Sequence, residues 1–449
     1  MLPTADHYWL TNAHVPAPLL ADCSNLEVMS DLAFVDLEIK AGQVAQIVPA
    51  GIPHAQPTVD LQRGLVWCCF VDLHSHLDKG HIWPRCPNPD GSFEAALAAC
   101  QTDQSNWRAE EVYRRMEFGL KCAYAHGTQA IRTHLDAYGE QAAISLEVFR
   151  TLQQAWADRI QLQAVSLVPI DYFSTPAGER LADQMAAVKG LLGGLPLMNP
   201  DLDRQLDRLF QLAQDRQLDL DFHTDESGNP DDITLRHVAQ AAVRHGFEGQ
   251  ITCGHCCSLA VQSAAQVRET LHWLKQARIG IVSLPMCNLY LQDRNQTIRL
   301  SPDLAQAVDP NPTRDPNPTR TPRWRGVTLV HELKQAGVPV AFASDNCRDP
   351  FYAYGDHDGL EVFTQAVRIA QLDAPHADWC QTVTTIPAKL MGLPQLGQIA
   401  VGQPADLILF KARYFHELLA RPQADRIVLR QGKPIDSRLP DYAELDDLW

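Results

Sequence analysis

The feature that most constrains the fold is an alternation of strand-like apolar runs with helical patterns between about residues 65 and 392. Several runs, such as 338–343, are continuously apolar, as expected of parallel strands buried on both faces. The predicted strands span 66–73, 128–134, 160–168, 188–197, 218–223, 250–254, 279–284 and 338–344. The predicted helices span 110–125, 139–154, 202–217, 234–245, 263–277, 327–336 and 359–369. Eight strands with intervening helices predict an α/β fold, a (β/α)8 TIM-like barrel.

Short stretches of alternating apolar and polar residues lie at both ends of the chain. They predict strands at 26–29, 33–39, 43–47, 397–400, 405–410 and 426–430, separated by tight turns. We expect the two β-rich ends, 1–64 and 393–449, to form one discontinuous small β-sandwich subdomain. The barrel would occupy residues 65–392.

The charge balance and the absence of targeting patterns restrict the partners. The chain has 38 Lys and Arg against 54 Asp and Glu, a formal net charge of −16, whereas nucleic-acid affinity rests largely on basic side chains. We recognise neither a secretory signal nor the ~20 apolar residues that span a bilayer. These features predict a cytoplasmic protein with no nucleic-acid or membrane partner. Its 12 cysteines are too few for a disulfide scaffold and are expected to be reduced.

One segment departs from the alternation. The hexapeptide DPNPTR at 309–314 is repeated at once at 315–320, and its prolines exclude a helix. The repeat falls between the seventh and eighth predicted strands, where a barrel loop reaches the catalytic mouth. We interpret 309–325 as a surface linker rather than a substrate lid, and both interpretations stay open.

Metal-competent side chains stand where five of the predicted strands end. Barrel enzymes carry their functional groups at the carboxyl ends of the strands. His74 and His76 are two residues apart on the first strand, so their side chains face the same side. The other strand ends carry His134, His223, His255 and Asp345. Three neutral imidazoles and one carboxylate suit Zn²⁺ or Fe²⁺, so the pattern predicts a metal site.

Several motifs resemble, in order, those of the amidohydrolase superfamily, and within it the cytosine deaminase group. They are HSHLDK at 74–79, RTHLD at 132–136, HTDE at 223–226, GH at 254–255, PMCNLYLQ at 285–292, RGVT at 325–328, and SD at 344–345 followed by DP at 349–350. The GQPADL turn at 402–407 is similar to the superfamily's carboxyl-terminal β return. The resemblance therefore covers roughly residues 65 to 360.

The resemblance implies a fold and a role for each matched residue. It implies a (β/α)8 barrel with a small β-sandwich from both termini. The ligands of one divalent ion, Zn²⁺ or Fe²⁺, would be His74, His76, His223 and Asp345. His255 and Asp345 would stabilise charge on the reacting carbon's oxygen. Glu226 would shuttle protons, which is typically worth ~10²–10⁴ in rate.

Residues around these ligands are predicted to position or contact the substrate. His134 and Asp136 are expected to orient a ligand. Gln292, in the matched 285–292 segment, is a candidate substrate contact that would equally hold its loop. Histidines 54, 81, 245 and 331 carry no pattern and are expected to be ordinary surface or core residues.

Three departures from the group concern the substrate. Cytosine deaminases carry a glutamine after the proline that ends the third strand, whereas Pro169 is followed here by Ile170, which cannot make paired hydrogen bonds. Asn346 and Phe351 stand where the group often has Asp and Trp. We expect Ile170, Asn346 and Phe351 to contact the substrate. The departures preserve the metal chemistry and put cytosine itself in doubt.

The sequence thus predicts a metal-dependent hydrolytic deaminase of a cytosine-like nitrogen heterocycle in pyrimidine metabolism. Ammonia would be released by attack of metal-bound hydroxide, since a bound metal lowers the pKa of water towards ~7. One alternative is an N-alkyl aminohydrolase acting on a triazine-like ring, of the N-isopropylammelide type, or a cyclic amidohydrolase. Another is a non-catalytic barrel that binds a small ligand. A homo-oligomer agrees with the resemblance, and no feature fixes its subunit number.

Overall fold

The middle of the chain forms a mixed α/β fold with two parallel sheets. The computed structural model describes residues 5–293, 322 and 324–449. Three strands form one sheet in the order β7 (Phe70–Ser75), β8 (Thr128–Asp136) and β9 (Gln161–Leu167). Five form the other in the order β10 (Leu192–Gly194), β11 (Leu220–Thr224), β12 (Ile251–His255), β13 (Gly280–Ser283) and β14 (Val340–Phe342). All neighbouring pairs within these two sheets are parallel.

Isolated parallel bridges join the two sheets at both edges. Val165 of β9 pairs with Leu191 just before β10, and Pro169 pairs with Leu195 just after it. Ser75, the last residue of β7, pairs with Asp345 beyond β14, and the Asp345 amide donates to the His74 carbonyl at 2.9 Å. The carboxyl ends of β7 and β14 are therefore held side by side.

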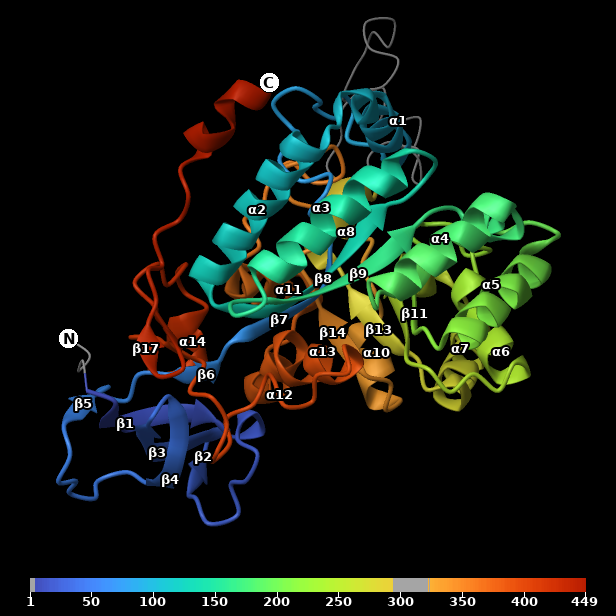
Figure 1. Cartoon of the computed structure of the whole chain (residues 1–449). Helices are drawn as coiled ribbons and strands as arrows, with labels where there is room; N and C mark the ends of the chain where they lie inside the picture. Colours follow the sequence, from blue (N-terminus) through green and yellow to red (C-terminus); the bar gives the residue numbers. More distant parts are fainter. Residues whose placement is uncertain (1–4, 294–321, 323) are drawn as a thin grey trace, which may run out of the picture.

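Helices surround these strands (Figure 1). They are α1 (Phe93–Asp103), α2 (Ala109–His126), α3 (Gln141–Ala155), α4 (Pro176–Ala187), α5 (Leu202–Arg216), α6 (Thr234–Arg244), α7 (Ala264–Ala277), α8 (Pro285–Leu291), α10 (Val330–Gln335), α11 (Gly359–Ala370), α12 (His376–Cys380), α13 (Thr385–Leu390) and α14 (Phe415–Leu418). Helix α2 shows how apolar spacing favours a helix, because Met116, Leu120 and Ala123 recur at helical spacing and are buried on one face. It ends at Gly127, whose φ of +99° favours glycine.

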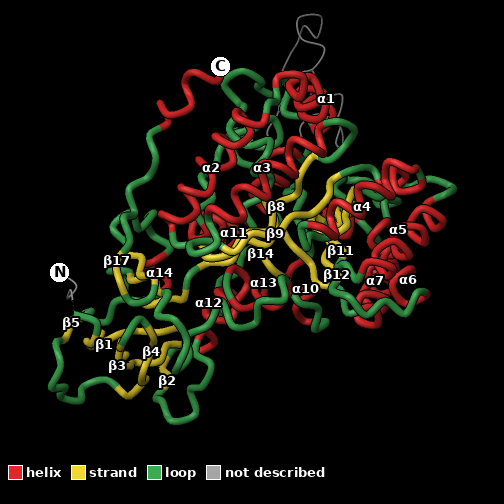
Figure 2. Tube along the Cα trace, in the orientation of Figure 1, coloured by secondary structure: helices red, strands yellow, loops and turns green. Residues whose placement is uncertain are grey.

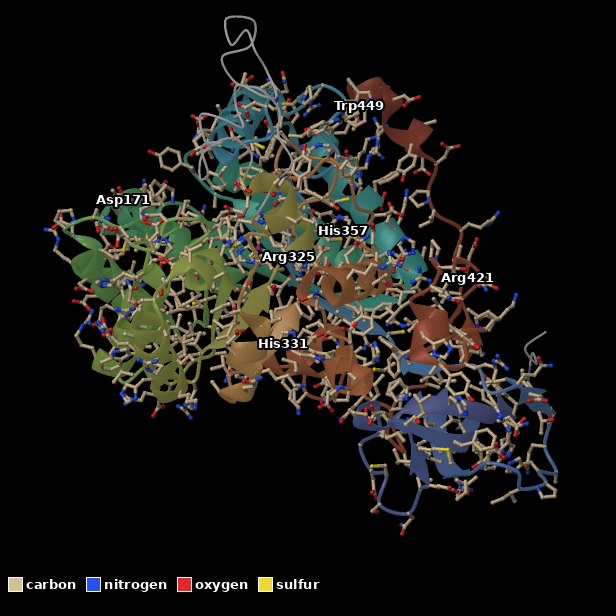
Figure 3. All side chains as sticks on the ribbon, turned by 180° about the vertical axis from the view of Figure 1, so that it is seen from behind. Asp171, Arg325, His331, His357, Arg421 and Trp449 are labelled. Carbon is tan, nitrogen blue, oxygen red and sulfur yellow. The ribbon has the colours of Figure 1, made fainter. Side chains whose placement is uncertain are left out.

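The two ends of the chain build two further sheets (Figure 2). The amino-terminal sheet contains β1 (His7–Pro16), β2 (Val28–Met29), β3 (Leu32–Lys40), β4 (Gln43–Pro49) and β5 (Thr58–Asp60). The other joins β6 (Val66–Cys68) to β15 (Leu407–Leu409), β16 (Ile427–Arg430) and β17 (Lys433–Pro434). Seen from behind, the carboxyl-terminal Trp449 lies at the opposite end of the molecule from the amino-terminal sheet (Figure 3).

Each of the eight predicted barrel strands contains an observed strand, but two differ in extent. The run 66–73 is divided at Cys69, whose amide donates to the Asp406 carbonyl, so β6 joins the terminal sheet and β7 joins β8. In the run 188–197 only Leu192–Gly194 is a strand, because its first residues close α4. Periodicity cannot separate one long strand from two collinear ones.

The terminal predictions also need two corrections. Residues 397–400 do not form a strand; Ile399 makes a single bridge to Leu20. Strand β1 was not predicted, because a bulge between Leu10 and Ala13 interrupts its alternation. Among the described residues, six helices also escaped prediction: α1, α4, α8, α12, α13 and α14. Apart from residues 322, 324 and 325, the 309–325 segment lies outside the described residues, so neither interpretation of it is tested.

One hydrophobic core connects the middle of the chain with its ends. Trp67 of β6 is fully buried, with ring centroids 5.3 Å from Phe363 of α11 and 6.1 Å from Phe410 beyond β15. Aromatic packing of this kind stabilises beyond area burial alone. Within the described part of the chain, no helix combines the length and the apolar character needed to cross a membrane.

Candidate functional site

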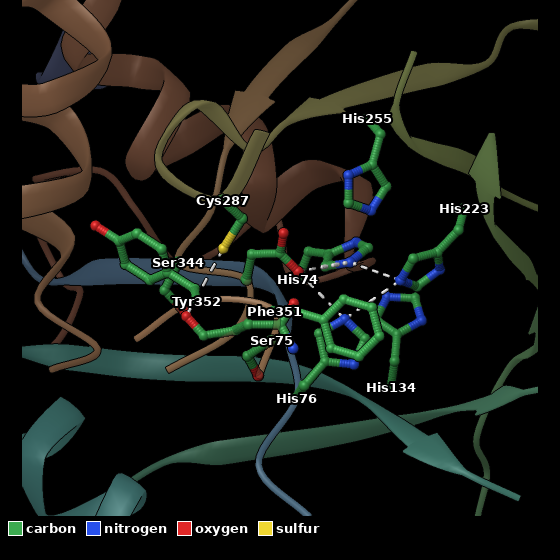
Figure 4. A network of polar contacts seen from close by, with 12 residues as sticks. His74, Ser75, His76, His134, His223, His255, Cys287, Ser344, Phe351 and Tyr352 are labelled. Atoms are coloured by element: carbon green, nitrogen blue, oxygen red, sulfur yellow. Dashed lines mark hydrogen bonds and ion pairs between the residues drawn. The ribbon is translucent and has the colours of Figure 1, made fainter. Parts of the chain in front are cut away.

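Three histidines converge at the carboxyl ends of β7 and β11. The Nε2 atom of His223 lies 3.2 Å from Nε2 of His74 and 3.3 Å from Nε2 of His76 (Figure 4). All three side chains are buried. Gly254 on the neighbouring strand β12 leaves room for this packing, since a Cβ there would lie 2.9 Å from Cε1 of His74. The strands therefore bring together imidazoles that are far apart in the sequence.

Asp345 completes the group from the segment after β14. Its Oδ1 atom lies 3.2 Å from Nε2 of His76 and 3.5 Å from Nε2 of His74. Asp345 has a φ of +62°, in the left-handed region, where it follows the bridge to Ser75. The four residues predicted as metal ligands are thus gathered at one point.

The donor atoms of this group suit a cation. Both carboxylate oxygens of Asp345 are buried and have no hydrogen-bond partner among the described residues. Burial lowers the pKa of His74, His76 and His223 well below the usual range, so the imidazoles are neutral, the form that binds metals. Burial also raises the pKa of Asp345 to about 7, against the opposing charge of His255. A buried carboxylate facing three lone pairs lacks a positive charge, and a divalent ion would supply it.

Glu226 and His255 lie beside this group and share a third partner. The Glu226 Oε1 atom is 3.1 Å from Nδ1 of His255 and accepts a hydrogen bond from Nδ2 of Asn288 at 3.1 Å. Burial would lower the pKa of His255, but the carboxylates of Glu226 and Asp345 outweigh it, so this pKa is raised. The Nε2 atom of His255 has no partner in the described chain. Sequence reasoning assigned Asn288 no role of its own, although it lies in the matched 285–292 segment.

A cavity of about 630 Å³ opens next to these groups. Its inner wall contains His76, His223, Glu226 and His255. The apolar part of its lining includes Phe93, Leu97, Val168, Pro169, Leu195 and Leu197. This volume falls within the roughly 300–1,000 Å³ typical of small-molecule sites.

Two of the four predicted substrate contacts line the cavity, and the other two do not. Asn346 and Phe351 line the cavity, whereas Ile170 and Gln292 are not among its lining residues. Ile170 is itself buried and opens a 3₁₀ helix, η3 (Ile170–Ser174). Gln292 donates from Nε2 to the backbone carbonyl of Glu226 at 3.2 Å, so it contacts the loop that carries Glu226.

The two residues expected to orient a ligand, His134 and Asp136, also lie in different surroundings. The ring of His134 packs against that of His74 with centroids 4.0 Å apart, and its Nε2 lies 3.8 Å from Oδ1 of Asp221. Asp136 faces the cavity, and its Oδ1 pairs with Nζ of Lys79 at 2.7 Å.

Lys79 and Asp136 form a polar corner in the otherwise apolar cavity. Gln104 donates from Nε2 to Oδ2 of Asp136 at 3.1 Å, and the Lys79 ammonium lies 5.3 Å from the centroid of Phe351. The amide of Asp136 in turn donates to Oδ2 of Asp78 at 2.8 Å. The HSHLDK and RTHLD motifs held the signal for Lys79 and Asp136, but no pattern indicated Gln104.

Fold and site together define a mixed α/β hydrolase with a buried histidine and aspartate cluster at its strand ends. A sequence profile of the amidohydrolase family matches residues 117–435. The chain belongs to the amidohydrolase family, and it is a hydrolase of C–N bonds that acts as a heterocycle deaminase. The resemblance to the amidohydrolase superfamily is thereby confirmed, and the non-catalytic alternative is excluded.

Particular relatives agree with this assignment. The chain is 49% identical to a pterin deaminase of Rhizobium rhizogenes strain K84, over 99% of this chain and 97% of the relative. It is 22% identical to N-isopropylammelide isopropyl amidohydrolase of Pseudomonas sp. strain ADP, over 79% and 81%. Its fold matches a solved 5-methylcytosine deaminase from Klebsiella pneumoniae with a TM-score of 0.79 and 24% identity, covering 97% of this chain and 98% of that one.

Proposed function

We propose that the protein is a metal-dependent hydrolytic deaminase of pterin-like substrates, which are fused bicyclic rings carrying an amino group on a pyrimidinone. The cavity of about 630 Å³ carries this proposal, because it is large for the single ring of cytosine. The 49% identical pterin deaminase supports it. A pterin keeps the cyclic amidine that the sequence predicts as the reacting group, so the expected chemistry is unchanged.

The proposal includes the architecture that holds the site. We infer that the two parallel sheets form a (β/α)8 barrel, joined through the bridges at Val165–Leu191 and Ser75–Asp345. Residues 1–64 and 393–449 would form the β-rich subdomain beside it. Barrel strands point their carboxyl ends to one mouth, which agrees with the convergence of the histidines.

One divalent ion, Zn²⁺ or Fe²⁺, would be held by His74, His76, His223 and Asp345. Neutral imidazoles and an unpaired buried carboxylate fit such an ion. When bound, it would supply Lewis-acid chemistry that makes water nucleophilic near neutral pH.

Glu226 is the proton carrier of this mechanism. It borders the cavity, and Asn288 fixes one of its oxygens at 3.1 Å. From there the carboxylate takes a proton from water, gives it to a ring nitrogen and assists the departure of ammonia. Gln292 holds the backbone at Glu226 and so fixes its loop.

His255 faces the cavity with an unpartnered Nε2 atom. Its raised pKa favours a protonated ring, which donates a hydrogen bond to oxygen that becomes negatively charged. Its opposite nitrogen, Nδ1, donates to Oε1 of Glu226 at 3.1 Å, which fixes the orientation of the ring. His255 thus stabilises charge while Glu226 moves protons.

The polar corner and the neighbouring residues Asn346 and Phe351 recognise the substrate. Asp136 and Asn346 offer acceptor and donor groups to ring nitrogens and the carbonyl, and Phe351 provides a face for stacking. Ile170 supports the wall from behind. This arrangement replaces the glutamine that reads cytosine in the related group.

An ammonia-release assay on metal-loaded protein tests the proposal. The panel contains 2-amino-4-oxopteridine, cytosine and an N-alkylaminotriazine. We expect kcat/KM to be highest for the pteridine. Turnover of cytosine without turnover of the pteridine would overturn the pterin assignment, and release of alkylamine from the triazine would instead favour the N-alkyl aminohydrolase.

A further inference from the structure

A second group of ligand atoms lies buried near the first. A ring nitrogen of His81, one of His357 and the sulfur of Cys347 all lie within 4.8 Å of one another. Each of these residues is at most 2% exposed. His81 follows β7, Cys347 follows β14, and His357 precedes α11, so the group joins three separate segments. The His81 amide donates to the Cys347 carbonyl at 3.0 Å, which fixes two of these segments together.

The nitrogens of this group lack the partners that buried imidazoles normally have. Both ring nitrogens of His81 and the Nε2 atom of His357 are buried without a hydrogen bond to any residue of the described ranges. A neutral imidazole carries one N–H, so His81 buries an unsatisfied donor in either tautomer. An unmet buried donor costs about 1–3 kcal/mol and calls for an explanation.

The opposite nitrogen of His357 is held by a polar chain. Its Nδ1 lies 3.3 Å from Oγ of Ser344, and that hydroxyl donates to Oδ2 of Asp72 at 2.5 Å. Because the Ser344 hydroxyl donates its hydrogen to Asp72, its oxygen accepts a hydrogen bond from Nδ1–H of His357. The Nε2 atom of His357 therefore presents its lone pair to the group, as it does in metal-binding histidines whose other nitrogen is hydrogen-bonded.

The charges around the group are mixed. Its cationic neighbours are Arg115 and Arg348, and its anionic neighbours are Asp349, Asp356 and Glu361. The anionic neighbours outnumber the cationic ones, so the surroundings accommodate an added divalent cation.

We propose that His81, Cys347 and His357 bind a second divalent transition-metal ion of the Zn²⁺ class. Two imidazoles and a thiolate are ligands that such ions prefer over water. Binding replaces the S–H bond of Cys347 with a metal–sulfur bond and releases one proton to solvent. The ion would connect the loop after β7 to the loop after β14, and these loops also carry His76 and Asp345. Its role is structural, and the inference does not depend on the substrate assignment.

Cobalt substitution tests this site selectively. The full-length protein is produced in Co²⁺-supplemented medium, and its cobalt content and near-ultraviolet absorption are measured. A thiolate ligand gives a sulfur-to-cobalt charge-transfer band, whereas the histidine and aspartate site contains no sulfur ligand. We expect the band in the wild-type protein. We expect Cys347→Ser and His81→Gln each to lose the band and one cobalt ion per chain.

Cys287→Ser is the matched control, because Cys287 is also a buried thiol beside the loop after β14, with its sulfur 3.8 Å from the Asn346 carbonyl. We expect this variant to keep the band and the full cobalt content. A wild-type protein without the band overturns the proposal, even if neither substituted protein folds. A band that survives Cys347→Ser, or disappears in Cys287→Ser, also overturns it.

Discussion

Two buried polar groups in the parallel sheets differ in whether their polar atoms have hydrogen-bond partners within the chain. Below the strand ends, Arg132 of β8 meets Asp221 of β11, with Nη1 of Arg132 2.8 Å from Oδ2 of Asp221. Every guanidinium nitrogen of Arg132 donates, the other acceptors being the side chains of Gln163 and Thr252 and the carbonyl of Leu390. At the strand ends, Asp345 and its three histidines bury their polar atoms without such donors.

The difference separates a group that is complete within the chain from a group that, in the proposed mechanism, binds a cation. A buried charge is tolerated when it is paired and hydrogen-bonded. Arg132 and Asp221 achieve this within the chain, so their partnership stabilises the fold without any ligand. Asp345 accepts no such hydrogen bond among the described residues, and in the proposed mechanism a bound cation adds to the charge of His255 in compensating it.

Removing the proton carrier is expected to have the largest effect, and only on chemistry. Glu226→Gln keeps the size of the side chain and its bond to Asn288, so we expect kcat to fall by about 10²–10⁴-fold. Ammonia release measures this loss. Metal content and the free energy of unfolding should match the wild type, and a near-normal rate would remove Glu226 from the mechanism.

Breaking the internal pair should affect stability instead. Arg132→Met leaves the carboxylate of Asp221 buried and unpaired, so we expect the free energy of unfolding to fall by about 3–5 kcal/mol. Urea unfolding at fixed metal concentration measures it. The double variant Arg132→Met/Asp221→Leu is the control and should recover most of the loss. If Arg132→Met unfolds like the wild type, the pair is not a scaffold element.

Binding of a divalent ion to the strand-end group should raise the free energy of unfolding. At a free Zn²⁺ concentration of 100 times Kd, an ion that binds only the native protein adds about 2.7 kcal/mol to the free energy of unfolding. We expect this gain in metal-depleted Cys347→Ser protein, in which the second proposed site is disabled. Adding His76→Ala to that background should abolish the gain at the same concentration, and an undiminished gain would contradict the proposed ligand set.

The smallest expected effect concerns the orientation of Glu226. Asn288→Ala removes one hydrogen bond to a carboxylate, worth about 1.5–3 kcal/mol, and we expect kcat to fall by about one to two orders of magnitude. Steady-state kinetics should show the loss in kcat rather than in KM. An unchanged kcat, with normal ion content, would mean that Asn288 does not position Glu226.

The sequence predicted which side chains lie together at the strand ends, because each is tied to a local pattern. His74 and His76 follow a buried apolar run, and Asp345 follows another, so the parallel architecture alone brings them together. The same reasoning predicted eight apolar runs, each of which overlaps an observed strand. The prediction failed where the local pattern carries no information about pairing. At Cys69, one apolar run divides into two strands that belong to different sheets.

Contacts between distant side chains were not predictable from pattern. Lys79 and Asp136 both belong to motifs found in the sequence, but only the structure shows that their charged groups lie 2.7 Å apart at the cavity. His81 appeared to be an ordinary histidine, because its neighbours Cys347 and His357 lie in distant segments. Asn288 lies on a helix that was not predicted, so its bond to Glu226 had no sequence signal.

The hydrogen bond from the Asp345 amide to the His74 carbonyl has a consequence for synthesis of the chain on the ribosome. The histidines of β7 emerge early, while the carboxylate that faces them is translated only after β13. A nascent chain therefore cannot assemble this centre until almost the whole run of parallel strands has left the exit tunnel. Acquisition of the metal would mark the completion of folding rather than initiate it.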